Sequence, residues 1–177
     1  HNVVVETGAG ISTLFLLNEM TNGNMYSVDT KPWCGFEVNH PNYELVLDDS
    51  LNALLPLFLK TGGWDFFLHD GNHDIKRQTY EYNFAYACLN PGGYIASDDY
   101  SWGEHKAWQV FLENHDLKAI KMGDIEIAQK PIYIQSMITL DTAKSVHKNC
   151  LELAEEAERI WLEWGNKNSE IKWDIRV

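Results

Sequence analysis

An alternation of strand-like and helix-like segments constrains the fold of this chain more than any other feature. Strand-like runs occupy residues 2–6, 24–29, 43–47, 64–68 and 94–97, and helix-like runs occupy residues 12–20, 51–60, 74–89 and 104–114. Apolar periodicity and the glycine, proline and asparagine turns between the runs support this assignment. Parallel strands need crossover connections, which helices supply. The alternation therefore predicts a mostly parallel sheet with helices on both faces.

The pattern changes after residue 114, where two strand-like runs follow each other closely. Residues 117–122 and 125–129 are joined by Gly123-Asp124, which is typical of an antiparallel hairpin. The fold class that we predict is α/β. It is a doubly wound (Rossmann-like), mostly parallel sheet with an antiparallel edge hairpin, in three α/β/α layers.

The tail of the chain carries apolar side chains at helical spacing between Val146 and Trp164, and most of its glutamates lie elsewhere. We expect a domain over residues 1–139 and an amphipathic helical tail over residues 140–177. The apolar face of that tail is expected to pack on the domain itself or on a partner, such as the second copy in a homodimer.

The charge of the chain limits its partners. Acidic residues outnumber basic ones, 26 to 14, and the formal net charge is −12 at pH 7. Such a surface repels nucleic-acid phosphates, so we expect no nucleic-acid partner. No apolar run approaches the roughly 20 residues that span a bilayer, so we expect no membrane partner. Three cysteines without a CxxC pair fit a reducing compartment, which predicts a cytoplasmic protein.

Every predicted parallel strand ends in at least one carboxylate. These residues are Glu6, Asp29, Asp48, Asp49, Asp70, Asp98 and Asp99. The carboxyl ends of strands in a doubly wound sheet meet at one crevice, where ligands bind. A single acid at such a place often only caps the next helix. So many like charges together repel one another unless cations or hydrogen-bond donors compensate them, and the set predicts a positively charged ligand.

The loop Gly8-Ala9-Gly10 follows the first strand and opens a helix. Small residues there let the backbone approach a ligand, and a helix N-terminus favours polar groups. A dinucleotide fingerprint would carry a third glycine where this chain has Thr13, and Glu6 would repel a pyrophosphate. S-adenosylmethionine has a sulfonium cation and an ammonium group but no phosphate. An acidic crevice therefore favours this cofactor over a nicotinamide dinucleotide.

Five short motifs together resemble the class I S-adenosylmethionine-dependent methyltransferases. They are Val5–Thr13, Ser27–Asp29, His69–His73, Asn90–Gly93 and Asp98–Tyr100, and the likeness covers about residues 3–130. Within this class the chain is most similar to the metal-dependent small-molecule O-methyltransferases, whose fourth strand ends in Asp-Gly-x-His and whose fifth ends in paired acids or Asp-Asn. The resemblance implies methyl transfer to a hydroxyl group of a small molecule.

The resemblance also implies which residues bind the methyl donor. Glu6, Gly8 and Gly10 would hold its methionine part, Asp29 its ribose, and Asp49 with Ser50 its adenine, with Asp48 as the rival of Asp49. The remaining members of the implied donor site are Thr7, Ala9, Ser12 and Asp70. Ser12 would bond the methionine carboxylate or cap the helix.

A divalent metal and a base complete the predicted site. Asp70, Asp98 and Asp99 offer the hard oxygen ligands that Mg²⁺ prefers. In similar methyltransferases such a triad holds an ion that a vicinal diol chelates, which lowers the pKa of the acceptor hydroxyl. His73 is the candidate general base and, with Asp70, forms the catalytic pair, although catechol-type enzymes carry a lysine at this position. The alternative role for His73 is a surface or helix-capping residue.

Two other functions stay open. The spacing of Asp29 is shared by ribose-binding acids of NAD sites, so a NAD-dependent dehydrogenase is one alternative. The other is a catalytically degenerate cofactor-binding or scaffold module, which would bind the donor without transferring its methyl group.

Overall fold

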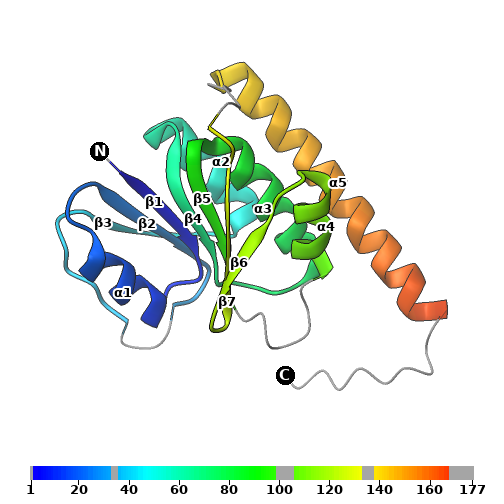
Figure 1. Cartoon of the computed structure of the whole chain (residues 1–177), viewed down its shortest axis with the longest axis horizontal. Helices are drawn as coiled ribbons and strands as arrows, with labels where there is room; N and C mark the ends of the chain where they lie inside the picture. The colour runs from blue at the N-terminus through cyan, green and yellow to red at the C-terminus, as the bar shows by residue number, and fades with distance from the viewer. Residues whose placement is uncertain (1, 33–35, 99–105, 133–137, 168–177) are drawn as a thin grey trace.

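The structure is a computed structural model that describes residues 2–32, 36–98, 106–132 and 138–167 (Figure 1). The elements in chain order are β1 (Val3–Thr7), α1 (Ile11–Glu19), β2 (Asn24–Asp29), β3 (Tyr43–Leu47), α2 (Ser50–Thr61), β4 (Trp64–His69), α3 (Ile75–Cys88), β5 (Leu89–Ser97), α4 (Lys106–Asn114), β6 (Ala119–Met122), β7 (Ile125–Gln129) and α5 (Leu140–Lys167).

The strands form one seven-stranded sheet in the order β3-β2-β1-β4-β5-β7-β6. The pairs β1–β2, β2–β3, β1–β4 and β4–β5 are parallel. Strand β7 is antiparallel to both β5 and β6. The predicted fold class, a mostly parallel doubly wound sheet with an antiparallel edge hairpin, is therefore confirmed. The order reverses between β1 and β4, and ligands of doubly wound sheets bind at such a point.

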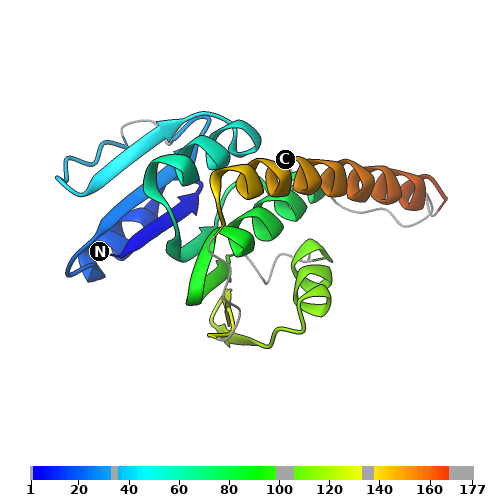
Figure 2. The same ribbon diagram turned by 90° about the horizontal axis from the view of Figure 1, so that it is seen from above.

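Neighbouring residues of β1 show that helices lie on both faces of the sheet. Val5 is fully buried in a core that it shares with α2, α3 and α4. Val4 packs instead against Leu17 of α1. Because consecutive strand side chains point to opposite faces, α1 covers one face and α2, α3 and α4 cover the other. Figures 1 and 2 show these three layers from two directions.

Most predicted elements agree with the structure to within two residues, but β5 starts earlier than predicted. The turn sequence at residues 90–93 suggested a strand from Tyr94. The structure instead pairs Leu89 with Trp64 of β4, with a register shift before the next pair, Phe66 and Tyr94. Asn90 also donates from Nδ2 to Asp65 Oδ1 at 2.9 Å. These contacts between distant residues extend the strand through the turn signal.

Helix α5 packs along α3 and continues beyond it (Figure 2). Ala143, Cys150 and Ala154 bury their side chains in the main core. The predicted apolar face of the tail included Leu153, which is 43% exposed, whereas its neighbour Ala154 is fully buried, so the buried face is slightly rotated from the predicted one. Among the described residues no helix has both the length and the apolar character needed to cross a membrane.

Candidate active site

A cavity of about 620 Å³ lies at the carboxyl ends of the parallel strands. It gathers most of the residues that the sequence indicated. Those on its wall are Thr7, Gly8, Ala9, Gly10, Ser12, Asp29, Asp48, Asp49, Ser50, Asp70 and Asp98. Glu6 and His73 are not on the wall. Asp99, the third predicted metal ligand, lies outside the described residues.

The glycine loop owes its shape to a close approach between two strand ends. Gly8 has φ +85°, a conformation that favours glycine, and a Cβ atom there would lie 2.0 Å from the carbonyl oxygen of Asp70. The amide of Gly8 donates to the Val28 carbonyl at 2.9 Å. Gly10 caps α1 and has no atom within 4 Å of its ideal Cβ position. The backbone of the loop is therefore tightly held on one side and open on the other.

Asp29 connects the end of β2 to this loop. Its Oδ2 accepts from the amide of Ala9 at 2.8 Å, and its Oδ1 accepts from the amide of Lys31 at 2.7 Å. A carboxylate oxygen has more than one lone pair, so both oxygens keep acceptor capacity for a hydroxyl group in the cavity. Asp29 thus positions the loop and still fits the role of a ribose ligand.

Glu6 lies beneath the loop, where its side chain has no exposed surface. Its Oε1 accepts from the hydroxyl of Ser27 at 2.5 Å and from the hydroxyl of Thr13 in α1. Burial raises the pKa of Glu6 to about 7, against the lowering effect of the two hydroxyl groups. Through these two hydrogen bonds Glu6 fixes the loop to α1 and β2. Its expected contact with the methionine part stays a prediction.

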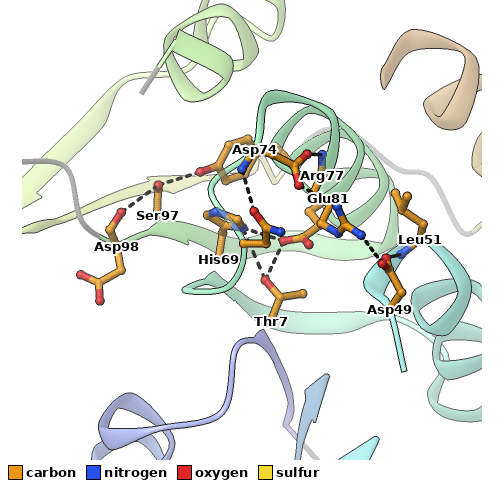
Figure 3. Close-up of polar contacts among 11 residues, drawn as sticks. Thr7, Asp49, Leu51, His69, Asp74, Arg77, Glu81, Ser97 and Asp98 are labelled. Carbon is orange, nitrogen blue, oxygen red and sulfur yellow. Dashed lines mark hydrogen bonds and ion pairs between the residues drawn. The ribbon is translucent and has the colours of Figure 1, made fainter. Parts of the chain in front are cut away.

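The adenine side of the cavity contains the two rival acids, and the structure gives them different tasks. Asp49 is the N-cap of α2, accepts from the amide of Leu51 at 3.0 Å and forms an ion pair with Arg77 (Figure 3). Asp48 is exposed, and its Oδ1 accepts from the amide of Asp49 at 2.7 Å. The carboxylate of Asp48 is therefore the more available of the two for a ligand.

Arg77 is the main residue of the site that sequence reasoning missed. From α3 it reaches Asp49 and also donates from Nη1 to Asp74 Oδ2 at 2.6 Å, as Figure 3 shows. Partial burial would raise the pKa of Asp49, but the guanidinium and the Leu51 amide lower it below its ordinary value. The carboxylates at the strand ends predicted that some cation or hydrogen-bond donor compensates them, but not which one. No local pattern pointed to a residue 28 positions away from its partner.

A buried polar cluster forms the floor of the cavity. Glu81 of α3 is 1% exposed and accepts from Thr7 Oγ1 at 2.6 Å. Its Oε2 also lies 2.6 Å from Nδ1 of His69, which has no exposed surface (Figure 3). The imidazole rings of His69 and His73 are perpendicular, with centroids 5.1 Å apart. The ring of His73 therefore contacts a buried ring.

Asp70 and Asp98 lie on neighbouring strand ends, as the metal hypothesis requires. Each follows a directly paired residue, because His69 pairs with Ser97 and the amide of Asp98 donates to the His69 carbonyl at 2.9 Å. Within the described ranges no group of three histidine, cysteine, aspartate or glutamate residues could hold a metal ion. Asp70 and Asp98 therefore lie at neighbouring strand ends, and the metal site itself stays a prediction.

Comparisons with known proteins agree with this geometry. Residues 5–100 match the family described as "Methyltransferase domain". The structure is similar to MycE methyltransferase of the mycinamycin biosynthetic pathway, in complex with Mg, SAH and mycinamycin VI. The TM-score is 0.59 and the identity 14%, over 78% of this chain and 48% of that chain. The chain thus spans about half the length of MycE. No curated protein sequence matches it.

Two further structures share the fold. The O-methyltransferase TomG from Streptomyces achromogenes, in complex with SAM, has a TM-score of 0.56 and 14% identity, over 73% of each chain. An O-methyltransferase from Bacillus cereus, in complex with SAH, has a TM-score of 0.53 and 15% identity, over 73% of this chain and 74% of that chain. At such identities the likeness shows a common fold.

Proposed function

This chain belongs to the methyltransferase domain family, and we propose that it transfers a methyl group from S-adenosylmethionine to a hydroxyl group of a small molecule. The observation that carries the proposal is the acid-rich wall of the cavity. Its carboxylates are Asp29, Asp48, Asp49, Asp70, Glu81 and Asp98. The described cations on the wall are Lys31 and Arg77, and Arg77 is already paired with Asp49 and Asp74.

This charge distribution separates the proposed cofactor from a dinucleotide. A sulfonium and an ammonium gain from nearby carboxylates, whereas a diphosphate would be repelled by them. The cavity wall supports S-adenosylmethionine for this reason and disfavours the NAD-dependent dehydrogenase. The intact acids also argue against a degenerate scaffold module.

Individual residues of the cavity fit the donor. The open side of Gly10 admits the methionine part, and Asp29 accepts from the ribose hydroxyls. The hydroxyl oxygens of Ser12 and Ser50 are buried and have no hydrogen-bond partner among the described residues. Both serines border the cavity, at the N-termini of α1 and α2. We assign Ser12 to the methionine carboxylate, and Ser50 with Asp48 to the adenine.

For the acceptor side, we propose that Asp70, Asp98 and Asp99 hold a divalent cation and that His73 removes the hydroxyl proton. S-adenosylmethionine, when bound, would supply the electrophilic methyl group and leave as S-adenosylhomocysteine, and a bound cation would lower the pKa of the acceptor hydroxyl. Asp70 and Asp98 orient the acceptor from two adjacent strand ends. The ring of His73 lies edge-on to that of His69, with centroids 5.1 Å apart. The Mg in the MycE complex supports the metal assignment.

We also propose that residues 1–139 are the catalytic body and that residues 140–177 are a tail docked on it. The contact between α5 and α3 supports this division. The cytoplasmic location, which rests on the cysteine content, stays a prediction.

Thermal unfolding with ligands tests the proposal. S-adenosylhomocysteine at 100 times its Kd should raise Tm by about 5–10 °C, because a ligand of the native state stabilises it by about 2.7 kcal/mol. NADH at the same concentration should leave Tm unchanged. A shift with NADH and none with S-adenosylhomocysteine would reverse the assignment.

A further inference from the structure

The β6–β7 hairpin carries an apolar strip that starts inside the cavity. We define the hairpin strip as Ile120, Met122, Ile125 and Ile127. Ile125 lies opposite Met122 in the ladder, and Ile127 lies opposite Ile120. Directly paired residues share a face of the sheet, so all four side chains point the same way. Ile120 and Met122 are 68% and 65% exposed, which leaves the strip open to solvent.

The direct pairings across the sheet show which face this is. Glu6 pairs with Leu68, Leu68 with Ala96, and Ala96 with Ile127. Glu6 accepts a hydrogen bond from Thr13 of α1, so the strip lies on the α1 face. The alternate residue Glu126 points to the other face, where it accepts from Trp108 Nε1 of α4 at 2.8 Å. In Figure 1, α1 and the β6–β7 turn lie at the same end of the sheet.

The strip and the proposed metal site are continuous. Ile125 and Asp98 both line the cavity, and the residue before Asp98, Ser97, pairs with Glu126, the residue after Ile125. From Ile125 the strip runs two residues along the strand to Ile127, a distance of about 7 Å. It contains no charged side chain. A polar group held at Asp98 therefore has an apolar surface next to it.

From this continuity we infer that the hairpin strip binds the apolar body of the acceptor, while the hydroxyl groups of that acceptor lie at Asp70 and Asp98. The inference rests on the proposed function, because it concerns the acceptor of that reaction. It names the substrate class as a neutral molecule with an apolar ring or chain next to its hydroxyl groups. An anionic acceptor is disfavoured by a chain of net charge −12. A second copy of the chain is the competing occupant.

The test is calorimetric titration with 4-methyl-, 4-propyl- and 4-hexylcatechol in Mg²⁺, both with and without S-adenosylhomocysteine. Kd should fall by about twofold for each added methylene. This corresponds to about half of the free energy of burying a methylene fully, because one side of the alkyl chain stays in water. From methyl to hexyl this amounts to about 30-fold. In Met122→Lys the gain in affinity from methyl- to hexylcatechol should be less than about threefold, because a charge replaces the apolar contact. Ile120→Lys, at the far end, should remove only the gain from propyl to hexyl.

Val110→Lys on α4 is the matched control, since Val110 is 41% exposed and lies on the opposite side of the sheet. Val110→Lys should keep the full gain in affinity from methyl- to hexylcatechol. An equal gain in wild type and Met122→Lys, or no gain in wild type, would overturn the inference. So would a wild-type dimer that Met122→Lys converts to a monomer in light scattering, because a second copy would then cover the strip. Failure of S-adenosylhomocysteine to bind counts against the proposed function, whereas the dependence on alkyl length tests the strip alone.

Discussion

Gly8 and Asp70 lie so close together that a Cβ atom on Gly8 would come within 2.0 Å of the Asp70 carbonyl oxygen. This contact joins the loop after β1 to the loop after β4. It therefore connects the residues proposed for the donor to those proposed for the acceptor.

The substitution Gly8→Ala should lower the free energy of unfolding by about 4 kcal/mol or more, the range of exceptional mutations. The clash is with backbone, which cannot rotate away. Gly62→Ala is the control, because Gly62 also has a positive φ but nothing within 4 Å of its Cβ position. It should cost about 1–3 kcal/mol, the strain of its backbone conformation alone. Urea unfolding measures both, and equal losses would contradict the importance of the contact.

Glu6 should make the protein less stable as pH rises from about 4.5 to about 7. Burial raises the folded-state pKa of Glu6 to about 7, so in this window the folded state keeps a proton that the unfolded state has released. The unfolded state then binds fewer protons, and stability falls with pH by at most about 3 kcal/mol. Glu6→Gln should flatten this part of the profile in urea unfolding. The exposed Glu19→Gln should leave the slope as in wild type.

Loss of Arg77 should loosen the adenine side of the site. In Arg77→Gln the N-cap Asp49 loses its ion pair, and we expect a fall in S-adenosylhomocysteine affinity of about fivefold, or about 1 kcal/mol. The loss of stability should be smaller than for a buried pair, because the ion pair is partly screened by solvent. Arg77→Lys should recover only part of the affinity, since lysine lacks the two-pronged geometry. Arg159→Gln, at the exposed ion pairs of α5, should leave binding unchanged in calorimetry.

Asp98→Asn should separate metal binding from donor binding. Manganese is a useful probe, because its electron paramagnetic resonance signal reports the free ion. The affinity for Mn²⁺ should fall by about tenfold or more, since a hard cation loses a charged oxygen ligand. S-adenosylhomocysteine should bind as in wild type. Asp124→Asn, in the hairpin turn, is the control, and an unchanged Mn²⁺ affinity in Asp98→Asn would remove Asp98 from the metal site.

Local sequence signals predicted the helices and strands and the carboxylates at the strand ends well. Apolar periodicity and an acid after a strand are both properties of neighbouring residues. Strands β2, β3 and β7 have the predicted bounds. The early start of β5 depends on the pairing of Leu89 with Trp64, which no local signal contains.

The roles of individual acids required the structure for the same reason. Glu6 is fully buried and accepts a hydrogen bond from the hydroxyl of Ser27, 21 residues away. Asp48 and Asp49 are adjacent residues of the same type, so the sequence does not distinguish them. In the structure Asp49 alone caps α2 and pairs with the guanidinium of Arg77.

The strand order reverses between β1 and β4, and this boundary separates the residues proposed for the donor from those proposed for the acceptor. Gly8, Asp29 and Asp48 come from the β1–β2–β3 half, while Asp98 and Ile125 come from the β5–β7 half. The two halves meet along the β1–β4 pairing, at the contact of Gly8 with Asp70, and through the side-chain contacts of Thr7 with Glu81 and of Asp49 with Arg77. The β6–β7 hairpin lies at the sheet edge, away from β1, β2 and β3, so grafting a different hairpin there would change the acceptor side and leave the donor side as it is.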